Sequence, residues 1–472
     1  MRSVLTKLLL TTVLLAFGAA ALSESAVAAE LAAGVAVVDI TPPQGYRMSG
    51  YFRERLNTGV HDPLHAKAIV LRHGEQGAAL VFCDLIGISL DVSKRARKLA
   101  SERTGIPISN ILVAATHTHT GPLYFGALRK HFHDPAVAQH GNDPHERTDY
   151  AEELVGKLVR VIVKAQAAMR RVRLEAGTAK QMGLCFNRRF HMKDGSVRFN
   201  PGVLNPNIVR PAGPVDSDVG VVLVRDAADG RPVAALVNFT LHLDTVGGTL
   251  YAADYPFHLE QSLRQNLGND FVLMFGNGTC GDINHVDVTR KERPKTETIG
   301  RTLAETILSE IPKLKPVVEP ALAVRSTTVN APLQQYSAAQ IAQARQDIQK
   351  VGTRKLPFLN QVKAYKIMAI ELRGGQTIPL EVQVFRLGED VALVGLPGEV
   401  FVELGLAIKQ ASPFQTTLVI ELCNDAPGYI PTKKAFAEGS YETVNSRIES
   451  GGGERLVEAA VRLLRQLKNR SE

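Results

Sequence analysis

Cysteine is scarce in this chain and forms no recognisable pattern. The four cysteines are far apart, and no CxxC pair occurs among the 472 residues; they are Cys83, Cys185, Cys280 and Cys423. This spacing argues against a cysteine-based zinc site and against a dense disulfide framework, because both need closely spaced or numerous thiols. One disulfide would fit an oxidising compartment, but the sequence does not choose its pair.

Long apolar runs are absent after residue 30, so no membrane-spanning helix is predicted there. A short apolar run covers residues 8–22, preceded by Arg2 and Lys7 and followed by small residues at 26–28. This is the pattern of a signal peptide. We therefore expect residues 1–28 to be a cleaved signal peptide and the protein to be periplasmic or secreted, with a retained membrane anchor as the alternative.

The charge pattern does not favour nucleic acid as a partner. The formal net charge is +8 at pH 7, but the basic residues are scattered along the chain. Such an excess is usual for a solvated surface, and it also favours peripheral contact with anionic lipid headgroups. With 45% hydrophobic residues and no low-complexity tract, residues 29–472 are expected to form a globular protein with a sizeable core, as one large domain or two tightly joined ones.

Short β-branched runs alternate with longer amphipathic runs almost to the C-terminus, and no internal repeat is found. This alternation predicts an α/β fold, with a mixed central sheet and flanking helices. Strands are expected at 34–40, 68–72, 79–83, 111–115, 219–224, 234–239, 271–275 and 391–395. Helices are expected at 92–103, 149–170, 255–267, 296–310, 338–349, 400–410 and 454–467. Long loops are expected at 125–147 and 190–214, where turn-forming residues cluster.

Two histidines follow the apolar strand expected at 111–115. They lie in the segment Thr116-His117-Thr118-His119-Thr120-Gly121-Pro122. Residues two apart on an extended segment share a face, so one ring could bind a metal while the other hydrogen-bonds substrate. A pair of surface histidines is the alternative interpretation.

His242 and Glu399 have the same kind of placement, each following an apolar strand. Ligands of catalytic metals commonly come from the ends of different strands, because the sheet holds them while loops leave a coordination position open. His242 could instead be a core histidine with a satisfied hydrogen bond. Glu399 could instead complement the dipole of the helix expected at 400–410.

Seven segments, in order along the chain, resemble motifs of the neutral/alkaline ceramidase family in its N-terminal catalytic domain. The similarity spans about residues 34–445. The segments are Ala36-Val37-Val38-Asp39-Ile40-Thr41-Pro42-Pro43 with Met48-Ser49-Gly50-Tyr51, Thr116 to Pro122, Asn187-Arg188, Asp254-Tyr255-Pro256, Gly276-Asn277-Gly278-Thr279-Cys280-Gly281-Asp282-Ile283-Asn284, Gly398-Glu399, and Gly428-Tyr429-Ile430-Pro431-Thr432.

The resemblance implies one zinc ion per chain, bound by four residues, with two more residues facing the scissile group. The implied ligands are His117, His242, Glu399 and Tyr429, and the implied catalytic residues are His119 and Arg188. Tyr441 is the alternative to Tyr429 if the register is shifted. Imidazole, carboxylate and phenol oxygen suit zinc, and water fills the open position. The expected activity is hydrolysis of an N-acyl amide bond in a lipid, ceramide being the expected substrate.

Two departures from the family pattern leave the substrate open. Asn284 stands where the family has a serine proposed to take part in catalysis, and the family's C-terminal immunoglobulin-like domain is not expected here. An amide is not a nucleophile, so direct attack by metal-activated water is preferred to an acyl-serine step. The alternatives are a hydrolase of another amide or ester, and a non-catalytic periplasmic protein that binds lipid or metal.

Two further hypotheses concern residues around the site. Asp282 or Asp244 could orient a metal-bound histidine, or could simply cap a turn. A second metal could be bound by the histidines of the loop expected at 125–147, which are His131, His133, His140 and His145.

Overall fold

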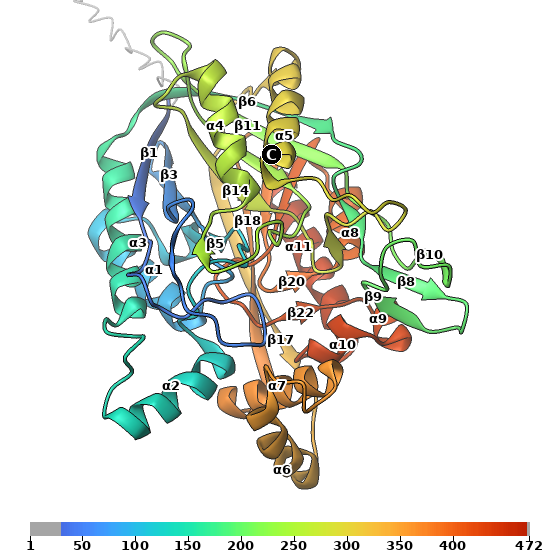
Figure 1. The fold of residues 1–472 in the computed structure, drawn as a ribbon. Coiled ribbons are helices and arrows are strands. Elements are labelled where there is room, and N and C mark those ends of the chain that lie inside the picture. Colours follow the sequence, from blue (N-terminus) through green and yellow to red (C-terminus); the bar gives the residue numbers. More distant parts are fainter. Residues whose placement is uncertain (1–29, 470–472) are drawn as a thin grey trace, which may run out of the picture.

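Two β-sheets pack face to face between outer layers of helices in the computed structural model of the protein (Figure 1). The model describes residues 30–469, so the signal peptide predicted at 1–28 lies outside it. Within residues 30–469, no helix combines the length and the apolar character that crossing a bilayer requires. The predicted α/β class with a mixed central sheet and flanking helices is confirmed, and the second sheet makes the arrangement four-layered.

The large sheet is mixed. Its strands lie in the order β14 (Val272–Asn277), β12 (Pro232–Phe239), β11 (Asp218–Asp226), β6 (Arg170–Lys180), β1 (Leu31–Asp39), β3 (His65–His73), β4 (Gln76–Cys83) and β5 (Ile111–Ala115), and β16 (Lys315–Pro316) also pairs with β6. The pairs β12–β14 and β4–β5 are parallel and the others antiparallel. Each parallel pair is connected through a helix, as parallel neighbours require.

The small sheet contains β17 (Ala323–Pro332), β18 (Thr377–Arg386), β19 (Val391–Gly395) and β21 (Thr416–Ile420), in that order. One apolar core fills the space between the two sheets, with Leu80, Leu236 and Leu393 among its members. Strands buried on both faces read as continuous apolar runs, which explains why β5 and β19 were recognisable from sequence.

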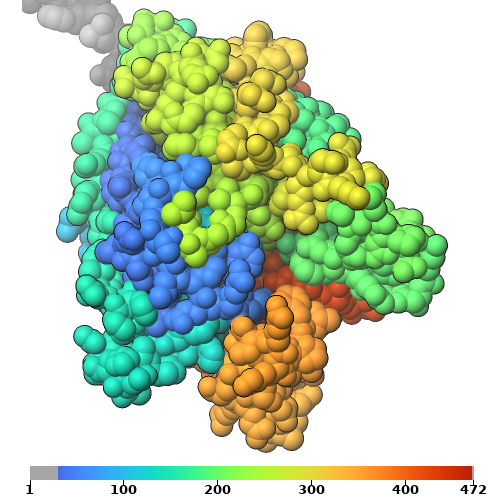
Figure 2. All heavy atoms as spheres, in the orientation of Figure 1, coloured from blue at the N-terminus to red at the C-terminus, as the bar shows by residue number. Residues whose placement is uncertain are grey.

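Six helices cover the outer faces of the sheets. Helices α1 (Leu90–Thr104) and α3 (Tyr150–Ala167) lie over one end of the large sheet, and α4 (Tyr255–Leu267) and α5 (Thr296–Glu310) over the other. The small sheet is covered by α8 (Val402–Ala411) and α11 (Gly452–Lys468). Helices α6 (Ala338–Asp347) and α7 (Phe358–Arg373) form an orange projection in Figures 1 and 2.

The remaining elements are short. They are the helices α9 (Lys433–Glu438) and α10 (Tyr441–Asn445), the 3₁₀ turns at Ile108–Asn110, Ile311–Lys313 and Ile348–Lys350, and three paired two-residue strands: β2 (Gly59–Val60) with β13 (Leu250–Tyr251), β7 (Phe186–Asn187) with β15 (Ile283–Asn284), and β20 (Glu399–Val400) with β22 (Tyr429–Ile430). All four cysteines are buried free thiols, so none of them forms a disulfide in this structure.

Both long loops predicted from sequence are wrong in part. Residues 125–147 contain α2 (Gly126–His140), whose residues Leu128 and Phe132 pack against Tyr365 of α7. Residues 190–214 contain most of a small antiparallel sheet of β8 (Arg189–Met192), β9 (Val197–Phe199) and β10 (Ile208–Pro211). In the first segment, packing against α7 stabilises a helix, and in the second, pairing between strands stabilises a sheet. Both interactions outweigh the local preference of these residues for turns.

Several strands were not predicted, including β6 and β17. In β6, buried and exposed positions alternate and arginines occupy the first exposed ones. In β17 the same alternation places Ser, Thr and Asn among the apolar residues. Such strands cover the core with one face only, so their sequences lack the continuous apolar run that marked the central strands.

Candidate metal and catalytic site

His117 lies two residues beyond the end of β5. At this point the chain is hydrogen-bonded to the segment that follows the neighbouring strand β4. Its backbone N–H donates to the carbonyl of Leu85 at 2.9 Å, and its φ of +82° lies in the left-handed region. The expected extended segment is therefore wrong, because the chain turns at His117. The rings of His117 and His119 nevertheless lie close, with centroids 5.0 Å apart. Strained backbone of this kind is common at functional sites.

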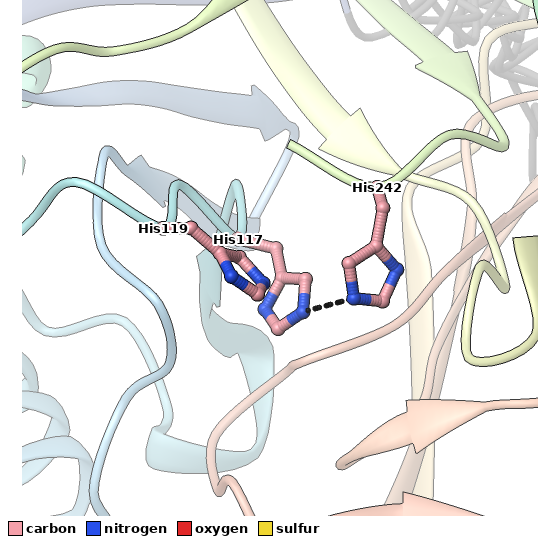
Figure 3. Close-up of side chains that lie close together, drawn as sticks. All are labelled: His117, His119 and His242. Carbon is pink, nitrogen blue, oxygen red and sulfur yellow. Dashed lines mark hydrogen bonds between the residues drawn. The ribbon is translucent and has the colours of Figure 1, made fainter. Parts of the chain in front are cut away.

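His117 and His242 point their Nε2 atoms at each other. The Nδ1 atom of His117 lies 2.7 Å from the carbonyl oxygen of Ile86, and Nδ1 of His242 lies 3.0 Å from that of Cys280. A neutral imidazole that donates from Nδ1 carries its lone pair on Nε2. The two Nε2 atoms are 3.1 Å apart (Figure 3), so both rings direct lone pairs to one point.

Glu399 completes this cluster from the short strand β20, which follows β19 of the small sheet. Its Oε2 atom lies 3.4 Å from Nε2 of His117 and 3.8 Å from Nε2 of His242. That oxygen is buried and has no hydrogen-bond partner. The expected helix begins at Val402 rather than at Val400, and Glu399 belongs to β20. The helix-dipole explanation of Glu399 is therefore wrong, because the residue lies outside the helix.

A close approach of two loops fixes the position of Glu399. A Cβ atom on Gly281 would lie 2.6 Å from the carbonyl oxygen of Glu399, well inside contact distance. The N–H of Gly281 donates to the carbonyl of Val400 at 2.9 Å, so the two segments are also hydrogen-bonded. Only glycine allows this approach, which explains its place in the Gly281-Asp282 motif.

The three groups fit a metal ion. Two imidazole lone pairs and an unpartnered carboxylate oxygen converge in a buried space, where unsatisfied acceptors are costly. Arg188 donates to Nε2 of His242 at 3.3 Å, but one guanidinium nitrogen does not serve all three acceptors. A divalent cation would satisfy them together, and nitrogen and oxygen donors of this kind suit zinc.

Arg188 and Tyr429 lie against the same cluster. The Nη2 atom of Arg188 donates to the Tyr429 hydroxyl at 3.0 Å and to the carbonyl of Gly281 at 2.7 Å. Its Nε atom donates to the buried carboxylate of Glu442 at 3.0 Å. Burial, together with Glu399, raises the pKa of Tyr429 well above its usual range, so the free phenol stays protonated. Tyr441, the alternative to Tyr429, has its ring centroid 5.5 Å away from that of Tyr429.

His119 is a neutral imidazole beside the cluster. Burial, followed by the neighbouring His117, lowers the pKa of His119 to about 4. Its Nε2 atom is buried and has no hydrogen-bond partner. His117, His119 and His242 each offer a nitrogen within 4.8 Å of the others. The structure therefore brings together the six residues that the family resemblance implied, namely His117, His119, Arg188, His242, Glu399 and Tyr429.

Of the two roles considered for Asp282 and Asp244, neither residue orients a histidine of the cluster, whereas Asp282 does cap a backbone amide. The Oδ1 atom of Asp282 accepts from the N–H of Val402 at 2.9 Å, and Oδ2 accepts from Asn187 at 2.8 Å. Asp244 pairs with His285 at 3.1 Å. Among the described residues, backbone carbonyls rather than these carboxylates hold Nδ1 of His117 and His242, so the carboxylate hypothesis is wrong for both aspartates.

The group of four loop histidines does not gather either. Only His133 lies near other potential ligands, namely Asp143 and Glu146. Both carboxylates are already neutralised, because Arg47 pairs with Asp143 and Arg129 donates to Glu146 at 2.8 Å. This cluster is an ion-pair network that ties the segment after α2 to the rest of the protein, and the predicted four-histidine metal site is absent from it.

Two buried carboxylates of the site escaped sequence analysis. Glu442 accepts from Arg188 and from Arg189, each at 3.0 Å, and so holds the guanidinium of Arg188 in place. Glu421 accepts from the thiol of Cys280 at 3.0 Å, directly behind His242. Glu421 directly follows the apolar strand β21, the same signal that marked His242, but that strand was not predicted from the sequence. For Glu442, only its proximity to the Tyr441 segment could have drawn attention to it.

A cavity of about 150 Å³ opens beside the cluster. Polar and apolar residues share its lining. The polar part includes His117, His119, Glu399, Tyr429, Tyr441 and Arg447, and the apolar part includes Phe52, Leu123, Phe125, Leu128 and Leu422. Asn284 does not line it. Its Nδ2 donates to Asn200 at 2.9 Å and its Oδ1 accepts from the N–H of Val286 at 3.0 Å, so both ends of this amide are occupied.

Comparisons with known proteins agree with the family resemblance inferred from the motifs. The chain is 25% identical over 509 residues to neutral ceramidase of Pseudomonas aeruginosa, covering 93% of this chain and 72% of that protein. The crystal structure of neutral ceramidase from Pseudomonas aeruginosa matches with a TM-score of 0.70 and 19% identity, over 94% of this chain and 75% of that one.

A structure of a ceramidase complexed with C2 matches with a TM-score of 0.68 and 18% identity, over 94% of this chain and 76% of that one. No protein-family model matches the chain. The ceramidase resemblance is thus confirmed over nearly the whole chain, and the fold is that of the neutral ceramidases.

Proposed function

We propose, with the similarity to neutral ceramidase as the premise, that this protein is a zinc-dependent hydrolase of an N-acyl amide bond in a lipid. Ceramide, which would yield sphingosine and a fatty acid, is the first substrate to test. The observation that carries the proposal is the convergence of Nε2 of His117, Nε2 of His242 and Oε2 of Glu399 on one buried point.

His117, His242, Glu399 and Tyr429 would hold the metal. Zinc bound there would activate a water molecule near neutral pH and polarise the amide carbonyl. The carbonyls of Ile86 and Cys280 keep Nδ1 of the two histidines protonated, which leaves both Nε2 lone pairs available. The burial of these ligands limits exchange with bulk water and strengthens their electrostatic interactions.

His119 and Arg188 would act on the substrate itself. The unpartnered Nε2 of neutral His119 is able to take up a proton and return it to the leaving amine. Arg188 is held charged and fixed by Glu442, so its N–H groups are oriented before substrate binds. Donors fixed in advance stabilise the negative charge that develops on the amide oxygen.

The reaction would proceed by direct attack of water rather than through an acyl-enzyme. Asn284, at the family's serine position, is buried, hydrogen-bonded at both ends and outside the cavity lining. An amide side chain is also not a nucleophile. We therefore expect no covalent intermediate to accumulate during turnover.

The cavity mouth would rest on a lipid surface. A cavity of about 150 Å³ is smaller than the roughly 300–1,000 Å³ sites that enclose drug-sized ligands, so the chains of a lipid would extend outward. Tyr51 lines the cavity and is exposed. The exposed Phe358 at the start of α7 lies beside the lining, because its ring is 6.0 Å from that of the lining residue Phe52, and the exposed Leu359 follows it in the chain.

Basic residues lie close to Phe358 and Leu359 in the sequence. Arg354, Lys355 and Lys363 are exposed, and among the described residues none of them pairs with a carboxylate. Exposed apolar side chains together with unpaired cations suit an anionic lipid surface. The protein would reach such surfaces after export to the periplasm or the medium, as the signal-peptide pattern of residues 1–28 predicts.

Vesicle sedimentation tests this surface. Binding to vesicles containing phosphatidylglycerol should fall when Phe358→Asp and Leu359→Asp are combined, and should weaken as salt is raised. The control Val318→Asp changes an apolar side chain that is even more exposed but lies outside the cavity lining. Equal binding by wild type and the double variant would refute membrane docking by α7.

Metal analysis paired with hydrolysis assays tests the function. The purified mature protein should contain about one zinc per chain and should release fatty acid from ceramide faster than from truncated N-acyl amides. His117→Ala should lose both zinc and activity, whereas His140→Ala, an exposed histidine outside the site, should retain both. Bound zinc without hydrolysis of any N-acyl substrate would instead indicate a binding protein, and faster hydrolysis of esters would indicate an esterase.

A further inference from the structure

Arg447 places a guanidinium in the lining of the catalytic cavity without a direct ion-pair partner. It lines the same cavity as His117 and Glu399. Among residues 30–469, no carboxylate forms an ion pair with it. Asp425 attracts it only through longer-range electrostatics and is itself paired with Arg373 at 3.2 Å. A positive charge in such a confined position is costly unless an anion compensates it.

The hydrogen-bonding capacity of Arg447 is also incompletely used. Its Nη2 atom donates to the hydroxyl of Tyr365 at 3.2 Å, and its Cζ atom lies 5.9 Å from the centre of that ring. Its Nε atom is buried and has no hydrogen-bond partner. Arginine offers five N–H donors in a planar fork that matches an oxyanion, and most of them are unused here.

Arg447 is held close to the candidate ligand Tyr429. A Cβ atom on Gly428, the residue before Tyr429, would lie 3.8 Å from Nε of Arg447. The carbonyl of Arg447 accepts from the N–H of Gln334 at 2.9 Å, and the hydroxyl of Ser446 donates to the carbonyl of Tyr429 at 2.9 Å. The backbone beneath the guanidinium is therefore tied both to the segment between β17 and α6 and to the strand β22.

The cavity lining has an apolar part and a polar part, which match the apolar acyl chain and the polar amine part of an N-acyl substrate. Leu123, Phe125 and Leu128 come from the segment after the histidine motif and offer an apolar surface suited to a fatty acyl chain. Arg447, by contrast, needs a polar and preferably charged partner. The acyl part of a lipid amide is hydrocarbon, so the anionic group would have to belong to the amine part.

We infer that Arg447 binds an oxyanion on the amine part of the substrate, so that the preferred substrates are N-acyl amines that carry a carboxylate or sulfonate beside the amide. This inference rests on the proposed N-acyl amide hydrolysis and narrows its substrate class. The hydroxyl groups of ceramide would reach the same guanidinium as neutral acceptors, which form weaker hydrogen bonds to a cation than an anion does.

Three substrates with one acyl chain test the inference: N-dodecanoylglycine, which carries a carboxylate, N-dodecanoyltaurine, which carries a sulfonate, and N-dodecanoylethanolamine, which is neutral. Wild type should cleave the anionic substrates with a kcat/KM roughly 10- to 100-fold higher than the neutral one, the range expected for a hydrogen bond to a charged group. The larger of the two anionic rates would identify the preferred oxyanion.

Arg447→Ala should remove this preference, mainly by raising KM for the anionic substrates, and kcat/KM should fall further for these than for the neutral substrate. Arg447→Lys, which retains the charge without the fork, should restore part of the preference. Arg231→Ala, an exposed arginine in the turn before β12, is the matched control and should behave as wild type. Equal losses on all three substrates, or no anionic preference in wild type, would overturn the inference.

A binding measurement separates this inference from the proposed function. Calorimetric titration of the metal-free protein with N-dodecanoylglycine requires no turnover, and Arg447→Ala should weaken the affinity roughly tenfold or more. Equal affinities in wild type and variant would refute the oxyanion site even if ceramide is hydrolysed. Weaker binding by the variant without any hydrolysis would support the oxyanion site and refute the hydrolase.

Discussion

Glu399 and Tyr429 are directly paired partners in the two-residue parallel ladder between β20 and β22. The pairing places a carboxylate and a phenol side by side at the edge of the cluster formed by His117 and His242. It also explains why both residues follow glycines at positive φ, Gly398 at +78° and Gly428 at +92°. Each glycine turns the chain from a loop into the short strand that presents the next side chain.

Zinc removal should destabilise the folded protein. A metal that binds only the native state adds about 2.7 kcal/mol to the free energy of unfolding at a free concentration 100 times its dissociation constant. Thermal unfolding with a chelator and after zinc is restored would measure this contribution. The melting temperature of His117→Ala should not respond to zinc, and an equal response in the variant would place the metal elsewhere.

Glu399→Gln keeps the shape of the side chain and removes its charge. Changing a residue that only hydrogen-bonds to a metal ligand lowers metal affinity by roughly 10- to 100-fold. Glu399→Gln changes a proposed ligand itself, so zinc affinity should fall by more than this. Competition with a chromogenic chelator would measure the affinity. Glu403→Gln, which changes a partly exposed glutamate of α8 paired with Lys434 at 3.3 Å, is the control. Unchanged affinity in Glu399→Gln would remove Glu399 from the ligand set.

Gly281→Ala should displace Glu399. The new Cβ would meet the carbonyl oxygen of Glu399 at 2.6 Å, and backbone atoms on both sides leave little room to adjust. Overpacking of this kind costs about 1–3 kcal/mol in unfolding free energy, and activity should fall further because the carboxylate moves. Gly247→Ala, at a position with nothing within 4 Å of the added atom, is the control for melting and activity assays. Full activity in Gly281→Ala would contradict this account of the loop contact.

The ion pair between Lys67 and Glu260 lies outside the candidate site. It should make the free energy of unfolding depend on pH. Their charged atoms are 2.6 Å apart and buried. Burial alone opposes ionisation, but Lys67 and the N–H of Leu273 lower the pKa of Glu260 below its usual value. A carboxyl whose pKa is lower in the folded state stabilises the protein above its unfolded pKa of about 4.3, and this contribution disappears as pH falls through the folded pKa.

Glu260→Gln should remove that contribution and leave Lys67 buried without a counterion. The free energy of unfolding at pH 7 should fall by about 3–5 kcal/mol, as for other broken buried ion pairs. The difference between wild type and variant should narrow as the pH falls below about 4.3. Denaturant titrations across this range would measure it, and a difference that is constant with pH would show that the carboxylate charge is not responsible.

The placement of the histidines could be read from the sequence. Apolar runs that are buried on both faces identified β5 and β12, and His117 and His242 follow those runs at once. The sequence thus placed each histidine at a strand end, but β5 and β12 lie near opposite ends of the strand order and run in opposite directions, so the convergence of the two rings depends on the tertiary structure. Glu399 could likewise be selected by the apolar run 391–395 that precedes it, whereas Tyr429 was identified only through the family resemblance.

Only the tertiary structure decided what holds these side chains. The carbonyls of Ile86 and Cys280 that orient the two imidazoles belong to the backbone, which every residue has, so no sequence pattern marks them. The same holds for α2, which forms a helix because α7 covers Leu128. Side-chain periodicity records which face of an element is buried, whereas the partner that buries it, and the unpaired charge of Arg447, depend on distant segments meeting.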